Sequence, residues 1–277
     1  MLWTVGAGHL TFTQKARAAQ VAACDILPLS YVNYRSELAA GRTPADLIAI
    51  AADHGVTLSF LDGFSDWAPV RYSPTLNDFM KQMLNFSTVE AFQMCHAIGA
   101  DSIIAIGAFD AGSQPLSALI DAFGGFCDEA KKAGIRVDLE FVPVLGIRTL
   151  REAWDVVKGA GASNSTIVFD TWSFMRSEPD YEFLDALPRG TISNVQFVDG
   201  HIRVHPESLW ADAFHNRLLP GDGEFPLTDI TNLLRRNQDI EFVGPEAIFD
   251  GQELLGSQAL GERVASSMKK ALGPYDR

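Results

Sequence analysis

Cysteine is scarce in this chain, and long apolar runs are absent. The three cysteines, Cys24, Cys95 and Cys127, are far apart and lack metal-binding spacing. They therefore predict reduced, mostly buried thiols, as in a cytoplasmic protein, and not a disulfide framework. No apolar run reaches about 18 residues, so we expect no transmembrane helix. The first four residues lack the basic-then-apolar pattern of a signal peptide.

Positive charge is also in short supply. The chain has 22 Lys and Arg against 35 Asp and Glu, a formal net charge of −13. A surface this acidic repels phosphate backbones, which argues against a nucleic-acid partner but leaves room for a local basic pocket. We therefore expect a small molecule as the partner, with no membrane contact. The sequence leaves oligomeric state open and is compatible with a homo-oligomer.

What the chain does contain is a strand-then-helix rhythm that repeats about eight times without a linker. Predicted strands cover residues 3–6, 24–29, 56–61, 102–106, 136–141, 166–169, 194–198 and 240–243. Predicted helices cover residues 12–22, 44–54, 87–98, 115–133, 150–159, 181–187, 227–235 and 257–272. Residues 63–85 are predicted to form a long loop. Strands alternating with helices indicate parallel βαβ units.

The length of 277 residues is close to the roughly 250 typical of one (β/α)₈ barrel. We therefore predict the α/β class and a single TIM-barrel domain over residues 1–277. A doubly wound open sheet is the alternative. Its phosphate-binding turn is missing, because Gly6-Ala7-Gly8 lacks the third glycine.

Polar residues stand where four of the predicted strands end. They are Glu140, Asp170, Gln196 and Glu246, and Asp170 closes the apolar run Ile167-Val168-Phe169. In a barrel these ends share the C-terminal face, where active sites form. Three carboxylates and an amide oxygen suit a divalent ion such as Mn²⁺ or Mg²⁺.

Each of these four residues also has an ordinary structural interpretation. Glu140 could pair with a nearby arginine, and Asp170 could cap the next helix. Gln196 could be a satisfied core amide, and Glu246 could lie on a surface loop. Taken together they favour a metal site, because several inward carboxylates without a cation would repel one another.

Further motifs surround these four residues: Leu139-Glu140, the run Phe169–Phe174, Gln196, the run His215–Glu224 and Gly244-Pro245-Glu246. In these motifs, and over most of its length, the chain resembles the xylose isomerase-like TIM barrels. That group includes sugar isomerases, 3-epimerases, inosose and dehydroshikimate dehydratases, and endonuclease IV. The resemblance implies one divalent metal ion held by Glu140, Asp170, Gln196 and Glu246. It also implies that Arg217, in the Arg-x-x-Pro-Gly-x-Gly segment, contacts substrate oxygens.

Several positions depart from the pattern of the family. Many members carry His where this chain has Ser173, and the ligand at Gln196 is often His. Sugar 3-epimerases often have a second Glu at the position of Gly146. These differences weaken the assignment of the chain as a free-ketose 3-epimerase. In the endonuclease, an Asp-x-His pair would fall on His215 and Arg217, and Arg cannot serve as that ligand. A role in DNA repair is therefore disfavoured.

A metal at this face would stabilise the enediolate or enolate formed when a proton leaves the carbon beside a carbonyl. Glu140 and Glu246 are candidate bases, and His215 is the histidine that the matched motif favours. His9, Trp172 and Trp67 are candidate substrate contacts. For any one histidine, a loop or packing role is the alternative, and for the tryptophans it is core packing.

Three functions remain open from the sequence. The first is a metal-dependent isomerase or epimerase of a sugar-like substrate. The second is a metal-dependent dehydratase, a lyase of the inosose or dehydroshikimate type. The third, from a different class, is a non-catalytic carbohydrate-binding barrel.

Overall fold

The computed structural model describes residues 1–3, 7–205 and 207–273. Residues 4–6 of the first predicted strand lie outside these ranges. The chain forms two compact units. The central unit comprises Pro28–Ile48 and Leu58–Phe169, and the terminal unit comprises Met1–Leu27, Ala49–Thr57 and Asp170–Arg277. Each unit is described by itself.

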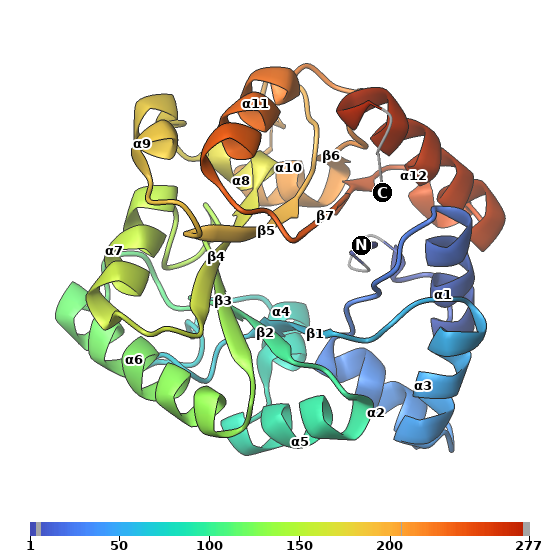
Figure 1. Ribbon diagram of the computed structural model, residues 1–277, viewed down its shortest axis with the longest axis horizontal. Coiled ribbons are helices and arrows are strands. Elements are labelled where there is room, and N and C mark those ends of the chain that lie inside the picture. Colours follow the sequence, from blue (N-terminus) through green and yellow to red (C-terminus); the bar gives the residue numbers. More distant parts are fainter. Residues whose placement is uncertain (4–6, 206, 274–277) are drawn as a thin grey trace. The chain divides into compact units, whose positions relative to one another are not determined.

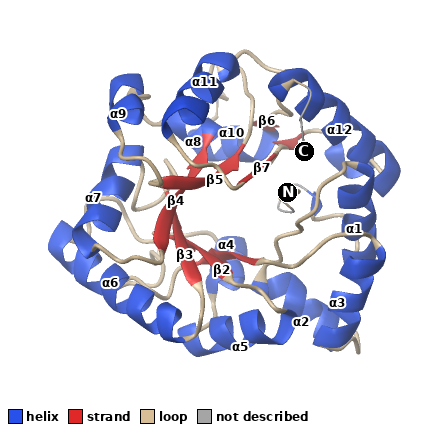
Figure 2. Ribbon diagram, in the orientation of Figure 1, coloured by secondary structure: helices blue, strands red, loops and turns tan. Residues whose placement is uncertain are grey.

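The central unit contains parallel strands, most of whose residues are buried. The strands are β1 (Phe60–Phe64), β2 (Ser102–Ile106), β3 (Arg136–Glu140) and β4 (Ser165–Asp170, of which the last residue belongs to the terminal unit). Strand β2 is buried at every position. Figure 2 shows the helices beside these strands, namely α5 (Thr88–Ile98), α6 (Leu116–Lys132) and α7 (Leu150–Ala160). A strand buried on both faces is typical of a parallel sheet covered by helices.

The boundaries of these helices follow local chemistry. Ser87 and Thr149 begin α5 and α7 with capping boxes, in which a Glu side chain returns to the capping residue. Gly99 and Gly161 end the same helices in the left-handed conformation, which glycine adopts without a steric penalty. Two further helices of this unit are α2 (Tyr31–Ala39) and α4 (Asp78–Leu84).

The terminal unit contains two strand pairs. Strand β5 (Ile192–Gln196) runs parallel to β7 (Phe242–Gly244), and β6 (Asn216–Arg217) runs antiparallel to β8 (Ile248–Phe249). Its helices are α1 (Phe12–Val21), α8 (Thr171–Arg176), α9 (Tyr181–Ala186), α10 (Leu209–His215), α11 (Leu227–Asn237) and α12 (Ser257–Leu272), with a 3₁₀ turn at Gln252–Leu254. Helix α3 (Pro44–Asp53) contributes residues to both units.

Helices α1 and α12 come from opposite ends of the sequence and pack side by side, as Figure 1 shows in blue and red. A Cβ at Gly261 of α12 would lie 2.6 Å from the Cβ of Val21 and 2.7 Å from the carbonyl oxygen of Ala18. The helices can approach this closely because glycine has no Cβ, and any larger residue here would push them apart.

Strands β1 to β4 are parallel to one another, β5 is parallel to β7, and all of them alternate along the chain with helices. This confirms the predicted α/β fold of the TIM-barrel type. The single domain over 1–277 stays a prediction. Among the helices of the described residues, none combines the length and the apolar character that crossing a membrane requires.

Several element predictions were wrong in detail. The strand predicted at 56–61 begins at Phe60 and continues to Phe64, so Asp62 lies inside it. Residues 24–29 form only isolated bridges, at Ile26 and Leu29, beside Pro28, which cannot donate to a ladder. The loop predicted at 63–85 contains helix α4. Helices α2, α8 and α10 were not predicted, and they are at most nine residues long.

Candidate active site

Asp170 is the last residue of β4 and the N-cap of α8, and it is fully buried. Its Oδ1 accepts the backbone N–H of Trp172 at 2.7 Å. Its Oδ2 accepts the hydroxyl of Ser173 at 3.2 Å and a hydrogen bond from Nη2 of Arg217. The capping role and an ionic role therefore occur together, one on each carboxylate oxygen.

Arg217 joins Asp170 to a second buried carboxylate. Its Nη2 also donates to Oε2 of Glu246, at 2.7 Å. The side chains of Arg217, Asp170 and Glu246 are 9%, 0% and 7% exposed, so solvent screens these pairs little. The β6–β8 ladder explains the approach: Arg217 pairs with Ile248, two residues beyond Glu246.

The face of Trp172 carries the Arg217 guanidinium. The central carbon of that group lies 5.1 Å from the centre of the indole ring, within the range of a cation–π contact. Trp172 is fully buried on α8. The indole therefore fixes one side of the guanidinium, while the two carboxylates bind its edge.

Gln196, the final residue of β5, is fully buried. Among the described residues, neither its Oε1 nor its Nε2 has a hydrogen-bond partner. A buried polar atom without a partner costs about 1–3 kcal/mol, so this amide is poorly explained as a satisfied core residue. Hard divalent cations accept amide oxygens as ligands, as they accept carboxylate oxygens, so the Gln196 side chain could be a metal ligand.

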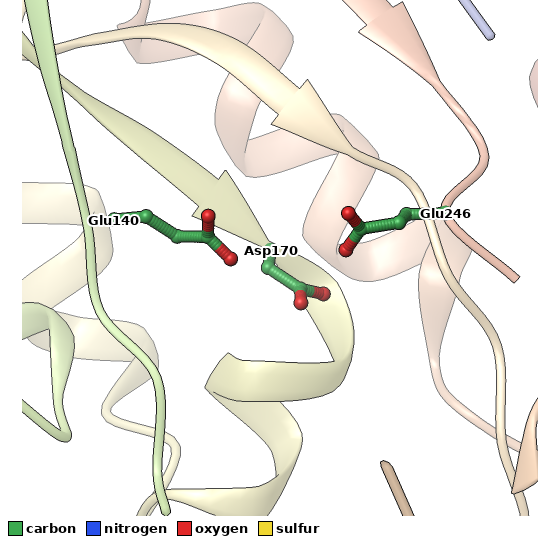
Figure 3. Close-up of side chains that lie close together, drawn as sticks. All are labelled: Glu140, Asp170 and Glu246. Atoms are coloured by element: carbon green, nitrogen blue, oxygen red, sulfur yellow. The ribbon is translucent and has the colours of Figure 1, made fainter. Parts of the chain in front are cut away.

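Glu140 belongs to the central unit, where it ends β3 opposite Val168 of β4. It is 7% exposed. Like Asp170 and Glu246 in the terminal unit, it is a buried carboxylate of the kind that can serve as a metal ligand. Figure 3 shows the element that carries each: Glu140 on a strand, Asp170 where β4 runs into α8, and Glu246 on the segment after β7.

The Pro-Gly segment after Arg217 owes its shape to Asp199. The buried Asp199 carboxylate accepts the backbone N–H groups of Gly200 at 2.8 Å, Gly221 at 2.9 Å and Phe225 at 2.9 Å. Gly221 has a φ of +85°, and a Cβ at Gly223 would overlap the Asp199 carboxylate. The glycines of this motif are thus required where the loop closes over a buried anion.

The candidate histidines His215 and His9 are exposed, unlike the buried carboxylates. His215 ends α10 with its side chain 48% exposed, and its Nδ1 lies 2.6 Å from Oδ1 of Asp250. His9 is exposed, and its Nε2 lies 2.9 Å from the carbonyl oxygen of Leu255. His205 and His215 rings are 5.9 Å apart. The catalytic role of His215 and the substrate role of His9 stay predictions.

The two candidate tryptophans differ in their surroundings. Trp67 lies in the central unit, 4% exposed, and its indole N–H donates to the carbonyl of Ile106 at 2.9 Å. Its ring packs edge-on against Phe109 and Phe123. This is the packing alternative considered for it, and its substrate role stays a prediction. Trp172 instead lies against Arg217, in the polar group.

Sequence reasoning missed Asp212, a fully buried carboxylate on α10. It accepts hydrogen bonds from the indole of Trp172 and from Arg176. Ser208, which caps α10, was the available signal for the helix, since Ser often precedes a first turn. Nothing in the sequence distinguishes Asp212 from the many surface aspartates of an acidic chain.

Comparison with known proteins identifies relatives of similar fold. A family model described as xylose isomerase-like TIM barrel matches residues 16–255. A 3-dehydroshikimate dehydratase from Pseudomonas aeruginosa is 24% identical over 189 residues, which are 67% of this chain and 28% of that protein. The chain thus spans less than a third of the length of this curated relative.

Two solved structures illustrate the likeness in fold. The IOLI protein with a bound zinc atom has a TM-score of 0.80 at 13% identity, over 98% of this chain and 96% of that one. A D-psicose 3-epimerase has a TM-score of 0.62 at 14% identity, over 99% of each chain. At such identities the likeness shows the fold alone.

Proposed function

The chain belongs to the xylose isomerase-like TIM barrel family, and from this premise we propose a divalent-metal-dependent isomerase or epimerase of a sugar-like keto or polyol substrate. The observation that carries the proposal is the buried polar group at strand ends. Asp170, Glu246 and the unpartnered amide of Gln196 are costly in a core and useful around a cation.

We propose Glu140, Asp170, Gln196 and Glu246 as the ligands of one ion, Mn²⁺ or Mg²⁺. The donor set supports this choice, because it consists of oxygens alone, and zinc favours nitrogen and sulfur donors. A bound ion would act as a Lewis acid toward the carbonyl oxygen of the substrate.

The protein's own residues supply the remaining chemistry. Glu140 or Glu246 takes the proton from the carbon beside the carbonyl, and the enediolate of the substrate results. Arg217, with five N–H donors in a planar fork, orients the substrate oxygens and offsets their developing charge. Return of the proton to the former carbonyl carbon, with one proton passing between the two oxygens, isomerises the substrate. Return of the proton to the opposite face of the original carbon epimerises it.

The remaining candidate residues keep the roles proposed for them. We propose His215, whose Nδ1 lies 2.6 Å from Oδ1 of Asp250, as a general acid or base. His9, Trp172 and Trp67 are proposed substrate contacts. The net charge of −13 repels nucleic acid, so we propose a small cytoplasmic substrate that is neutral or is bound through the metal ion.

A second candidate is a dehydratase, which one observation favours. The curated relative from Pseudomonas aeruginosa is named as a 3-dehydroshikimate dehydratase. Dehydration shares the first proton transfer, after which a hydroxyl leaves from the neighbouring carbon as water. The two reactions therefore differ only after this first proton transfer.

Metal analysis of the purified protein, followed by product analysis, tests both candidates. Solvent deuterium uptake by a ketose without new ultraviolet absorbance supports isomerisation or epimerisation, and a new enone absorbance supports dehydration. Glu140→Gln should abolish turnover, while the exposed control Glu129→Gln should retain it. If the protein binds no divalent ion and Glu140→Gln binds sugars unchanged, a carbohydrate-binding barrel replaces the enzyme.

A further inference from the structure

Asp212 collects four hydrogen bonds on two oxygens, in the buried interior of the terminal unit. Oδ2 accepts the indole N–H of Trp172 at 2.8 Å and Nε of Arg176 at 2.7 Å. Oδ1 accepts the backbone N–H of His205 at 2.7 Å and the amide of Asn216 at 3.1 Å. Its side chain has no exposure to solvent.

This arrangement requires a carboxylate and not an amide. All four partners are donors, and each Asp212 oxygen serves two of them. An Asn at this position would turn its NH₂ group toward one of the two donor pairs, because Asn has a single acceptor oxygen. Burial raises the pKa of Asp212, but hydrogen bonds led by that of Arg176 outweigh this and lower it, so the group stays charged.

One of the four bonds leads toward the candidate active site. Trp172 donates its indole N–H to Asp212, and the face of the same ring lies under the guanidinium of Arg217. The indole of a tryptophan has one donor, so this single hydrogen bond fixes the rotation of the ring in its plane. Arg217 in turn donates to Asp170 and Glu246.

We infer that Asp212 is a positioning residue for Arg217, acting through the indole of Trp172. The carboxylate holds the ring, the ring supports the guanidinium, and the guanidinium is thereby held with Nη2 between Asp170 and Glu246. The inference rests on the proposed function only where it assigns Arg217 to substrate binding. The position of Arg217 itself is a property of the folded chain.

The competing explanation is that Asp212 only anchors its other partners. Arg176 donates to the carbonyl of His201 at 2.6 Å and lies 4.9 Å from the ring centre of Phe225. Loss of Asp212 would then loosen this segment and leave Arg217 as it is. A measurement that reports on Arg217 alone separates the two explanations.

Nuclear magnetic resonance of ¹⁵N-arginine-labelled protein provides that measurement. Arg217 is assigned from the signal lost in Arg217→Lys. In Asp212→Asn we expect the Arg217 guanidinium protons to lose their upfield ring-current shift and to exchange faster with solvent. The matched control is Asp185→Asn, which removes an exposed carboxylate bonded to Arg236 in the same unit and should leave Arg217 unchanged.

If Asp212→Asn changes the Arg176 signal but not that of Arg217, the inference is overturned. If this variant does not fold, Trp172→Phe decides the matter, since it removes one N–H and leaves Asp212 its other three donors. We expect faster solvent exchange of Arg217 in Trp172→Phe, while Arg263, which lies over the ring of Phe249, should be unchanged. Wild-type exchange of Arg217 in that variant would overturn the inference.

Metal binding provides a second measurement, which links Asp212 to the proposed function. Because a loosened Arg217 competes less with the ion for Asp170 and Glu246, manganese affinity, measured by calorimetry, should rise in Asp212→Asn. Asp185→Asn should match wild type. If wild type itself binds no Mn²⁺, the proposed function fails, while the arginine signals still decide the role of Asp212.

Discussion

Replacing Arg217 by Met would test how far the buried carboxylates depend on their cation. The variant keeps most of the side-chain volume but leaves Asp170 and Glu246, at 0% and 7% side-chain exposure, without this partner. Breaking a buried pair by removing one member typically costs 3–5 kcal/mol, so we expect a loss of about 4 kcal/mol in the free energy of unfolding. That is a large part of the roughly 5–15 kcal/mol of a folded domain.

A divalent ion should restore much of this loss if the proposed site is correct. Binding to the folded state alone contributes about 2.7 kcal/mol when the free ion is at 100 times its dissociation constant. In wild type the same ion must compete with Arg217 for both carboxylates, whereas the variant lacks this competitor. Stabilisation by Mn²⁺ should therefore be larger in Arg217→Met than in wild type.

Urea unfolding with chelator and with excess Mn²⁺, followed by circular dichroism, measures both effects. Arg263→Met is the matched control: Arg263 also lies over a ring, 4.8 Å from the centre of Phe249, and pairs with Asp222 at 3.4 Å. These side chains are 46% and 44% exposed, so the control should lose about 0–1 kcal/mol. Equal losses in the two variants, or equal stabilisation by Mn²⁺ in wild type and Arg217→Met, would refute the reasoning.

Three further predictions follow from other buried groups. Gln196→Met removes two buried atoms without partners, so the metal-free protein should be as stable as wild type or more so, while Mn²⁺ affinity measured by calorimetry falls about tenfold or more. The pKa of Asp212 is lowered in the folded protein. Its carboxylate therefore stabilises the fold fully above the ordinary pKa of 3.8 and loses this effect as the pH falls through the lower pKa of the folded state. In acid titrations, the difference in stability between wild type and Asp212→Asn should shrink below about pH 4. Burial raises the pKa of Cys95 and Cys127 to about 12, so both thiols should react with Ellman's reagent at pH 8 only after urea is added.

The sequence was most informative where one local signal dominates. Strand β2 was predicted at its observed bounds, since Ser102–Ile106 is a short apolar run between a glycine-terminated helix and a glycine. Helix α12 was likewise predicted at Ser257–Leu272. The carboxylates at the ends of β3 and β4 followed from the same reasoning, because a charged residue rarely closes a buried strand without a role.

Short elements were less predictable, and they carry the contacts that complete the candidate site. The β6–β8 ladder has two residues on each side, too few for an alternating pattern to be recognised. It is nevertheless what brings Arg217 near Glu246. Helix α10, seven residues long, presents Asp212 to Trp172. Such pairings depend on tertiary packing between segments distant in sequence, and no window of the sequence contains both partners.

The double role of Asp170 argues that this polar group is retained for more than stability. A cap alone would need one oxygen, and Oδ1 already serves it through Trp172. Oδ2 is buried and accepts hydrogen bonds from Ser173 and Arg217, although replacing a buried ion pair by apolar residues is often neutral or stabilising. Gln196 adds a polar group without partners among the described residues. A core selected for stability alone would remove both costs, whereas a site that must bind a cation and an oxygen-rich substrate needs these atoms available.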